Sequence, residues 1–180
     1  MKKAAFMMLA LFSMFLVRSA MAQDMSAEKP EIVKRVMTMV GNWQANMTQT
    51  MGNQSTQVTD KINFQSTAGD HGLLGMETME TPNHKQYFAT HLVGWDPMTK
   101  QLHWYIVDNM GTTNDSQGEL VDPNHVRLTN TSNMEGKTSK TEVNLVWQND
   151  DWIKFNLVQT VNGAVKESMQ GDFKRSEGMH

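Results

Sequence analysis

The sequence predicts an all-β fold, a single antiparallel up-and-down barrel of about ten strands preceded by one short helix. Apolar and polar residues alternate with a period of two in successive short runs, and turn-forming residues separate these runs. No segment between them is long enough for a crossover helix. The chain contains no cysteine, so no disulfide framework holds these strands. Closing one sheet into a barrel removes its two unpaired edges, which makes this the favoured architecture.

The one expected helix covers residues 31–40, directly after Pro30, a residue suited to a first helical turn. Its apolar residues recur at helical spacing and share one face. They are Ile32, Val33, Val36, Met37 and Val40.

Ten strands are expected after this helix, in meander order. They are Trp43–Met51, Gln57–Phe64, Leu73–Met79, Gln86–Trp95, Leu102–Asp108, Asp115–Leu120, Val126–Thr131, Ser139–Trp147, Ile153–Thr160 and Val165–Lys174.

Three hairpins can be placed in register, and the register decides which side chains share the barrel interior. Pairing Asp96 with Gln101 predicts an apolar inner face made of His91, Val93, Trp95, Leu102, Trp104 and Ile106. A three-residue turn at residues 149–151 predicts a second inner face made of Val143, Leu145, Trp147, Ile153, Phe155 and Leu157.

The third hairpin turns at Val161-Asn162-Gly163, with Gly163 expected in a left-handed conformation next to a bulge. This arrangement predicts that Val165, Glu167, Met169, Phe173 and Arg175 face inward. A tighter Asn-Gly turn would reverse that face, so both orientations of Glu167 stay open.

Residues 1–22 have the three parts of a secretory signal peptide: basic Lys2-Lys3, an apolar stretch, and a small-residue ending at Ala22. We expect cleavage after Ala22, then a flexible tail over 23–30 and the barrel domain over 31–180. The mature protein would be periplasmic or secreted and would have no membrane anchor, since the apolar stretch is shorter than a bilayer span. An uncleaved anchor is the alternative.

Composition and motifs argue against several classes of function. The formal charge is −3, and it becomes −6 once the signal peptide with its three basic residues is removed, which argues against nucleic-acid binding. No hydrolase, metalloprotease or nucleotide-binding motif is present, so no catalytic residue is predicted. His91 and His103 fall on opposite faces of one hairpin, and the methionines are scattered singly, so no metal site is predicted.

Several short motifs resemble those of known barrels. Gly41-Asn42-Trp43 after a short helix, with Arg175 ending the last strand, resembles the lipocalin and wider calycin barrels. Gly94-Trp95-Asp96-Pro97, together with Trp104–Asp108, resembles a bacterial lipocalin-like family whose function is not established. The resemblance implies a barrel in which Trp43 plugs one end and Arg175 stacks on it. It implies no catalytic residue.

The resulting hypothesis is an exported protein that holds a small hydrophobic or amphipathic molecule inside its barrel. The predicted lining is Tyr87, His91, Trp95, Trp104, Trp147, Phe155 and Glu167. The sequence identifies no cofactor. Three alternatives stay open: a haem-binding barrel that uses His91, an envelope protein that acts through its surface, and an enzyme that uses His91 or Glu167 as acid or base.

Overall fold

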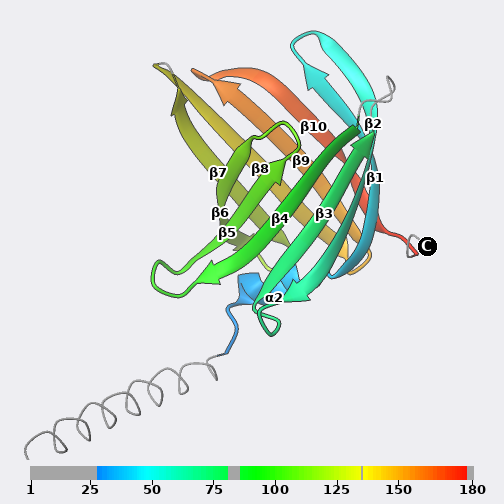
Figure 1. Ribbon diagram of the computed structural model, residues 1–180, viewed down its shortest axis with the longest axis vertical. Helices are drawn as coiled ribbons and strands as arrows, with labels where there is room; N and C mark the ends of the chain where they lie inside the picture. Colours follow the sequence, from blue (N-terminus) through cyan, green and yellow to red (C-terminus); the bar gives the residue numbers. More distant parts are fainter. Residues whose placement is uncertain (1–27, 81–85, 135, 178–180) are drawn as a thin grey trace, which may run out of the picture.

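The computed structural model describes residues 28–80, 86–134 and 136–177. Ten antiparallel strands form a closed barrel, with the short helix α2 (Glu31–Met37) at its lower end (Figure 1). Each strand pairs with the next one in sequence, and β1 pairs with β10 to close the barrel. The predicted fold class is therefore confirmed. The predicted signal peptide, residues 1–22, lies outside the described residues. Within the described ranges, no helix has the length and apolar character needed to cross a membrane.

The strands extend one to three residues beyond most of the predicted ones, because backbone pairing continues past the alternating patterns. They are β1 Gly41–Met51, β2 Gln54–Thr67, β3 Gly72–Glu80, β4 Gln86–Asp96, β5 Gln101–Asp108, β6 Thr113–Asp122, β7 His125–Met134, β8 Lys137–Asn149, β9 Trp152–Val161 and β10 Ala164–Arg175.

Helix α2 closes the lower end of the barrel. Ile32, Val33 and Val36 bury their side chains in the core, as the helical spacing predicted, but the helix ends at Met37 and not at residue 40, and Val40 is 39% exposed. Arg35 fastens the helix to the β6–β7 turn, since its Nε donates to the Pro123 carbonyl at 2.8 Å. Its guanidinium also lies 5.6 Å from the Trp147 ring centroid, an attractive cation–π geometry.

Trp43 and Arg175 complete the plug next to the helix. The indole Nε1 of Trp43 donates to the Met39 carbonyl at 2.7 Å, and the Arg175 guanidinium lies 4.5 Å from the ring centroid. Arg175 Nη1 donates to the Val40 carbonyl at 2.7 Å, and Nη2 donates to the Thr38 carbonyl at 3.0 Å. The last strand thereby holds the segment that leads from the helix into the first strand.

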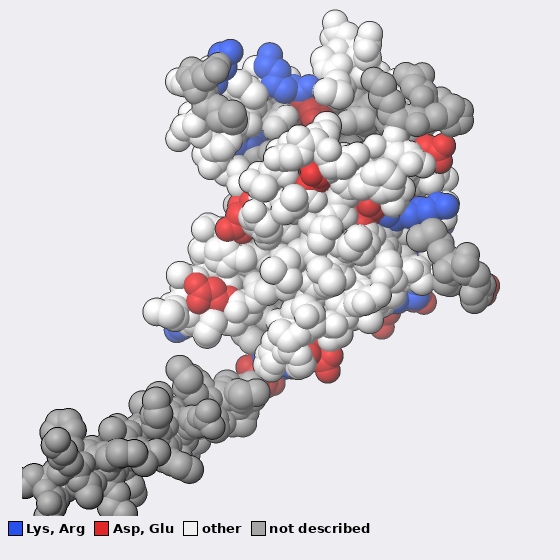
Figure 2. Space-filling view, in the orientation of Figure 1, with Lys and Arg blue, Asp and Glu red and all other residues white. Residues whose placement is uncertain are grey.

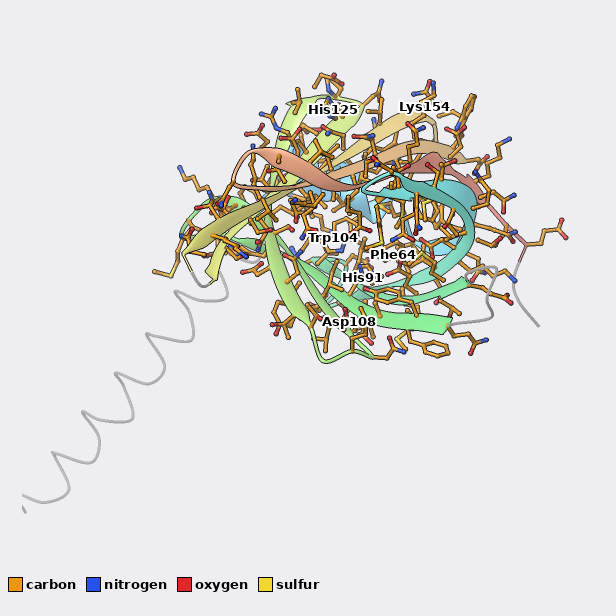
Figure 3. The ribbon with its side chains drawn as sticks, turned by 90° about the horizontal axis from the view of Figure 1, so that it is seen from above. Phe64, His91, Trp104, Asp108, His125 and Lys154 are labelled. Atoms are coloured by element: carbon orange, nitrogen blue, oxygen red, sulfur yellow. The ribbon has the colours of Figure 1, made fainter. Side chains whose placement is uncertain are left out.

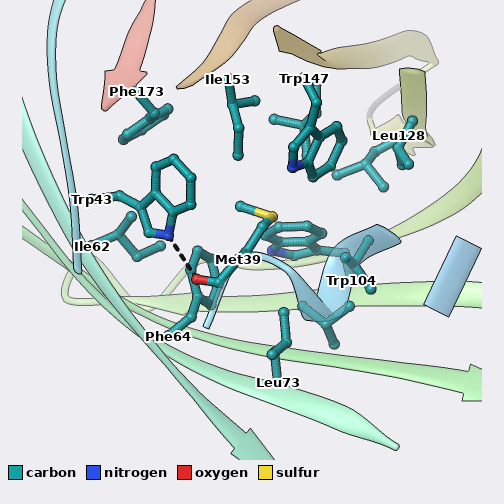
Figure 4. Packing of buried hydrophobic residues seen from close by; sticks show 14 of the residues in the cluster. Met39, Trp43, Ile62, Phe64, Leu73, Trp104, Leu128, Trp147, Ile153 and Phe173 are labelled. Atoms are coloured by element: carbon teal, nitrogen blue, oxygen red, sulfur yellow. Dashed lines mark hydrogen bonds between the residues drawn. The ribbon is translucent and has the colours of Figure 1, made fainter. Parts of the chain in front are cut away.

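The lower half of the barrel is filled with buried apolar side chains (Figure 4). Contributions come from α2, the segment after it, and strands on all sides of the barrel. The buried cluster includes Met39, Trp43, Phe64, Leu73, Val93, Leu102, Trp104, Val126, Leu128, Leu145, Trp147, Ile153 and Phe173. The lower half of the barrel is therefore a packed core and not a ligand-binding cavity.

The inner faces of the first two hairpins are as predicted, although the turn of the second is tighter than predicted, since Asn149 pairs with Trp152 and the register shifts between Trp147 and Asn149. Asp96 pairs with Gln101, and Trp147 pairs with Ile153, so both apolar faces point inward. In the third hairpin the turn is tighter than predicted: Val161 pairs directly with Ala164, and Asn162 and Gly163 both have positive φ angles of 51° and 80°.

This tighter turn alone would reverse the inner face of β10, but a register shift between Val165 and Glu167 restores it. Glu167, Met169 and Phe173 therefore face inward, as predicted. The prediction for Val165 is wrong: it lies before the shift, opposite Thr160, and is 62% exposed.

Gly75 on β3 is required by close packing inside the barrel. A Cβ at this position would lie 2.5 Å from Phe64 Cε1 and 3.1 Å from His91 Cβ. We expect Gly75→Ala to destabilise the protein by about 1–3 kcal/mol through overpacking, measured by urea denaturation. Gly94→Ala is the matched control because no atom lies within 4 Å of a Cβ built there. Equal losses for the two variants would contradict this packing.

The outer surface has two notable regions. An apolar patch crosses β3, β4 and β5, a face that is mostly uncharged in Figure 2. Its exposed residues are Leu74, Met76, Phe88, Leu92, Tyr105 and Val107. A groove of about 890 Å³ lies over the outer faces of β1, β8, β9 and β10. Polar side chains such as Asn46, Asn144 and Gln170 line most of it.

Candidate functional site

The exposure of the inward-facing side chains increases in the upper half of the barrel, above the packed core. Many inward-facing side chains there are half-buried, so solvent reaches them from the end opposite α2, while others, such as Val58, Asp60 and Ala89, stay buried. Figure 3 looks into this end, with Phe64, His91 and Trp104 inside the ring of strands and His125 and Lys154 outside it. The half-buried inner residues include Gln49, Glu77, Tyr87, Ile106, Phe155, Leu157, Gln159 and Glu167.

Three rings form the boundary between the core and this upper half. Phe64, His91 and Trp104 come from β2, β4 and β5, and each ring packs edge-on against the other two. Their centroids are separated by 5.7–6.0 Å. Edge-to-face contacts of this kind hold aromatic rings in fixed orientations. His91 is therefore positioned by packing as well as by its hydrogen bonds.

The hydrogen bonds of His91 determine its protonation. The Trp104 indole Nε1 lies 2.8 Å from His91 Nδ1, and an indole N–H is only a donor, so Nδ1 must be an unprotonated acceptor. His91 is consequently neutral and carries its proton on Nε2. That nitrogen donates to Glu77 Oε2 at 2.7 Å. Both ring nitrogens are engaged, and the imidazole is 6% exposed.

This arrangement does not suit the predicted haem alternative. An iron ligand needs a free imidazole nitrogen, and His91 offers none without breaking its bond to Trp104 or to Glu77. Among the described residues, no group of three or more histidine or acidic side chains is arranged to hold a metal ion.

A buried acid pair continues the chain of contacts beyond His91. Asp60 on β2 faces inward between Val58 and Ile62, is 3% exposed, and forms a hydrogen bond with Glu77. Burial, together with the charge and hydrogen bond of Glu77, raises the pKa of Asp60 to about 9. Asp60 is therefore protonated at neutral pH and donates to the Glu77 carboxylate. Its other oxygen, Oδ1, has no hydrogen-bond partner among the described residues.

Two further carboxylates face the same interior. Glu167 on β10 accepts a hydrogen bond from Gln49 Nε2 at 2.7 Å. Asp108, at the end of β5, accepts from the backbone N–H groups of Met110 and Thr112, each at 2.9 Å. Burial raises the pKa of Tyr87, and so do the negative charges of Glu77, Asp108, Asp60 and Glu167. The Tyr87 hydroxyl thus lies within the electrostatic reach of all four acids.

The structure separates the seven residues predicted from sequence into two groups. Five lie along the inner wall at or above the aromatic boundary: Tyr87, His91, Trp104, Phe155 and Glu167. The other two, Trp95 and Trp147, belong to the lower half: Trp95 packs against the core, and Trp147 is buried beneath Arg35 of the helix. The Nε1 of Trp147 has no hydrogen-bond partner among the described residues.

Sequence reasoning missed Asp60, Glu77 and Asp108. A usable signal existed, because Asp60 alternates in phase with the apolar Val58 and Ile62. The β2–β3 hairpin was not placed in register because its connection has no standard turn pattern: three successive residues, Ala68 to Asp70, all have positive φ angles. Without that register, the contact between Asp60 and Glu77 could not be inferred.

Comparison with known proteins gives information about the fold alone. No family model matches the sequence, and no curated protein sequence is similar to it. The resemblance to a bacterial lipocalin-like family therefore stays a prediction.

Among solved structures, Rv2717c from M. tuberculosis has a TM-score of 0.60 at 10% identity, covering 83% of this chain and 100% of that one. The S-type phycobiliprotein lyase CPES from Guillardia theta has a TM-score of 0.52 at 8% identity, covering 82% and 94%. The chain therefore has the closed antiparallel fold of lipocalin-like barrels.

Proposed function

We propose that this chain is an exported protein, periplasmic or secreted, that holds a small amphipathic molecule in the upper half of its barrel. One observation carries the proposal: the inner wall of the lower half is packed core, whereas a group of inward-facing side chains in the upper half is only half-buried. Evenly packed side chains would leave no such difference. Phe155, Ile106 and Leu157 offer apolar contacts, while Tyr87, Gln159 and Glu167 offer polar ones.

The fold supports this proposal without identifying a ligand. Closed barrels of about this size have interiors just wide enough for side chains or one small molecule. One structural neighbour is an S-type phycobiliprotein lyase, so the same fold occurs in a protein of that name. The ligand of this chain is a separate question.

The first test is the mass of the intact protein, purified from its native host, under native and denaturing conditions. We expect the native mass to exceed the denatured mass by that of one small organic molecule. Equal masses would contradict a resident ligand. A mass difference equal to the mass of haem would contradict the arrangement in which both ring nitrogens of His91 are held in hydrogen bonds to Trp104 and Glu77.

Tryptophan fluorescence can locate the binding event. Trp104 faces inward at the aromatic boundary, whereas Trp152 lies on the outer face beside Lys154 and Lys174. A ligand in the upper half should change the emission of the wild type and of Trp152→Phe, but not that of Trp104→Phe. The reverse pattern would place the ligand on the outer surface.

The surface-interaction alternative has one observation in its favour, the apolar patch over β3, β4 and β5. Exposed apolar patches are typical of interaction sites. If this patch is where the protein acts, Leu92→Lys should abolish association with a second copy, measured by sedimentation, and leave the fluorescence response unchanged.

A further inference from the structure

The inner wall of the upper half is strongly acidic. Asp60, Glu77, Asp108 and Glu167 all face inward from four different strands. Among the described lysines and arginines, Lys137 alone has the inward register in this region, and it is exposed at the rim. The described lysines nearest to its rim, Lys137 and Lys166, are exposed at the ends of β8 and β10. Below this rim, no described lysine or arginine side chain faces the interior to balance the charges of Glu77, Asp108 and Glu167, whereas Asp60 is protonated and adds no charge.

A second, independent observation concerns hydrogen bonding. Asp60 is only 3% exposed, and its Oδ1 is a buried acceptor that lacks a donor among the described residues. Leaving a buried polar atom without a partner is costly. Asp60 also forms hydrogen bonds with Glu77 and with the Lys61 backbone, but Oδ1 remains without a donor among the described residues.

We propose that the molecule held in the upper half is an organic cation, a protonated amine attached to an apolar body. The inference rests on the proposed function and specifies its ligand. The ammonium would donate to Asp60 Oδ1 and lie among the inward carboxylates, where opposite charges attract strongly in a partly desolvated site. The apolar body would pack on the side chains of Ile106, Phe155 and Leu157.

An organic cation fits better than a metal ion. The described residues contain no group of three or more side chains arranged to coordinate a metal. The carboxylates already have fixed roles in hydrogen bonds, with Glu167 bonded to Gln49 and Glu77 bonded to His91. An ammonium adds donors without requiring these oxygens to converge on one point. The half-buried Tyr87 ring on the inner wall also favours a cation over a neutral group.

The test uses three probes with one chain length and different charge: octylamine, octanol and octanoate. Binding to the ligand-free protein is measured by tryptophan fluorescence and calorimetry at pH 7. We expect octylamine to bind about tenfold or more tightly than octanol, and octanoate to bind most weakly. If octanol or octanoate binds as tightly as octylamine, the charge inference is wrong and the carrier function stands. If none of the three probes binds, both the charge inference and the proposed function are wrong.

Two charge-matched variants separate the local effect from net charge. Glu167→Gln removes an inward carboxylate, and Glu119→Gln removes an exposed one that pairs with Arg127 on the outer face. We expect Glu167→Gln to reduce the preference for octylamine over octanol about threefold to tenfold, and Glu119→Gln to leave it unchanged. Equal reductions in both variants would show that overall charge, and not the interior, attracts the amine.

Discussion

Asp60→Asn is expected to remove the loss of folding stability that accompanies rising pH between pH 5 and pH 8. In the folded protein the pKa of Asp60 is raised from 3.8 to about 9, so the folded state keeps a proton that the unfolded chain releases. Stability must therefore fall as pH rises through this window and level off above about pH 9. The slope is up to about 1.4 kcal/mol per pH unit, or up to about 4 kcal/mol across the window.

Asparagine is the suitable replacement because its amide still donates to Glu77 but does not titrate. The free energy of unfolding should be measured by urea denaturation at several pH values for wild type and variant. The lowered pKa values of Asp96 and Glu142 affect stability mainly below pH 5, outside this window. Asp150→Asn, in the exposed β8–β9 turn, is the control and should follow the wild type. Parallel curves for wild type and Asp60→Asn would show that the buried acid is ionised.

Trp43→Ala is expected to destabilise the protein by about 3–5 kcal/mol, the range for truncating a fully buried Trp. Trp43 is 1% exposed, and it connects the segment after α2 to the last strand through its bond to Met39 and its contact with Arg175. Trp43→Phe should lose less, about 1–2 kcal/mol, because a phenyl ring still fills most of the site, although the N–H donor and part of the ring volume are lost.

Both losses are measured as shifts in the urea midpoint with unchanged slope. Trp152→Ala is the control: this tryptophan is half-buried on the outer face and should cost far less. A loss below about 1 kcal/mol in Trp43→Ala would mean that the lower end of the barrel does not depend on its plug.

The fold was predictable because local alternation and turn chemistry agree along most of the chain. The Asp96–Gln101 and Trp147–Ile153 pairings follow from apolar residues that must share one face. The third hairpin shows the limit of this reasoning. Its Asn162-Gly163 turn favours a register that the bulge before Glu167 then reverses, and a bulge leaves no reliable pattern in one sequence.

The candidate site was predictable only in part, for a physical reason. Aromatic residues such as Trp104 and Phe155 were found because apolar side chains mark an inner face. Acidic residues at inward positions look like ordinary surface residues unless the register of their strand is known. Asp60 and Glu77 meet through the β2–β3 pairing, which only the structure supplies.

The seam between β1 and β10 has a consequence for how the chain folds. Arg175 is 135 residues away from Val40 in sequence, yet its guanidinium donates to the Val40 carbonyl and stacks on the Trp43 ring. Ring closure and capping therefore both wait for the last strand, which makes them late, long-range events in folding. A chain emerging from a ribosome would expose the free edges of β1 and β9 until β10 arrives. Unpaired edges are where strands from different molecules join, so this interval is when the protein is most prone to aggregate.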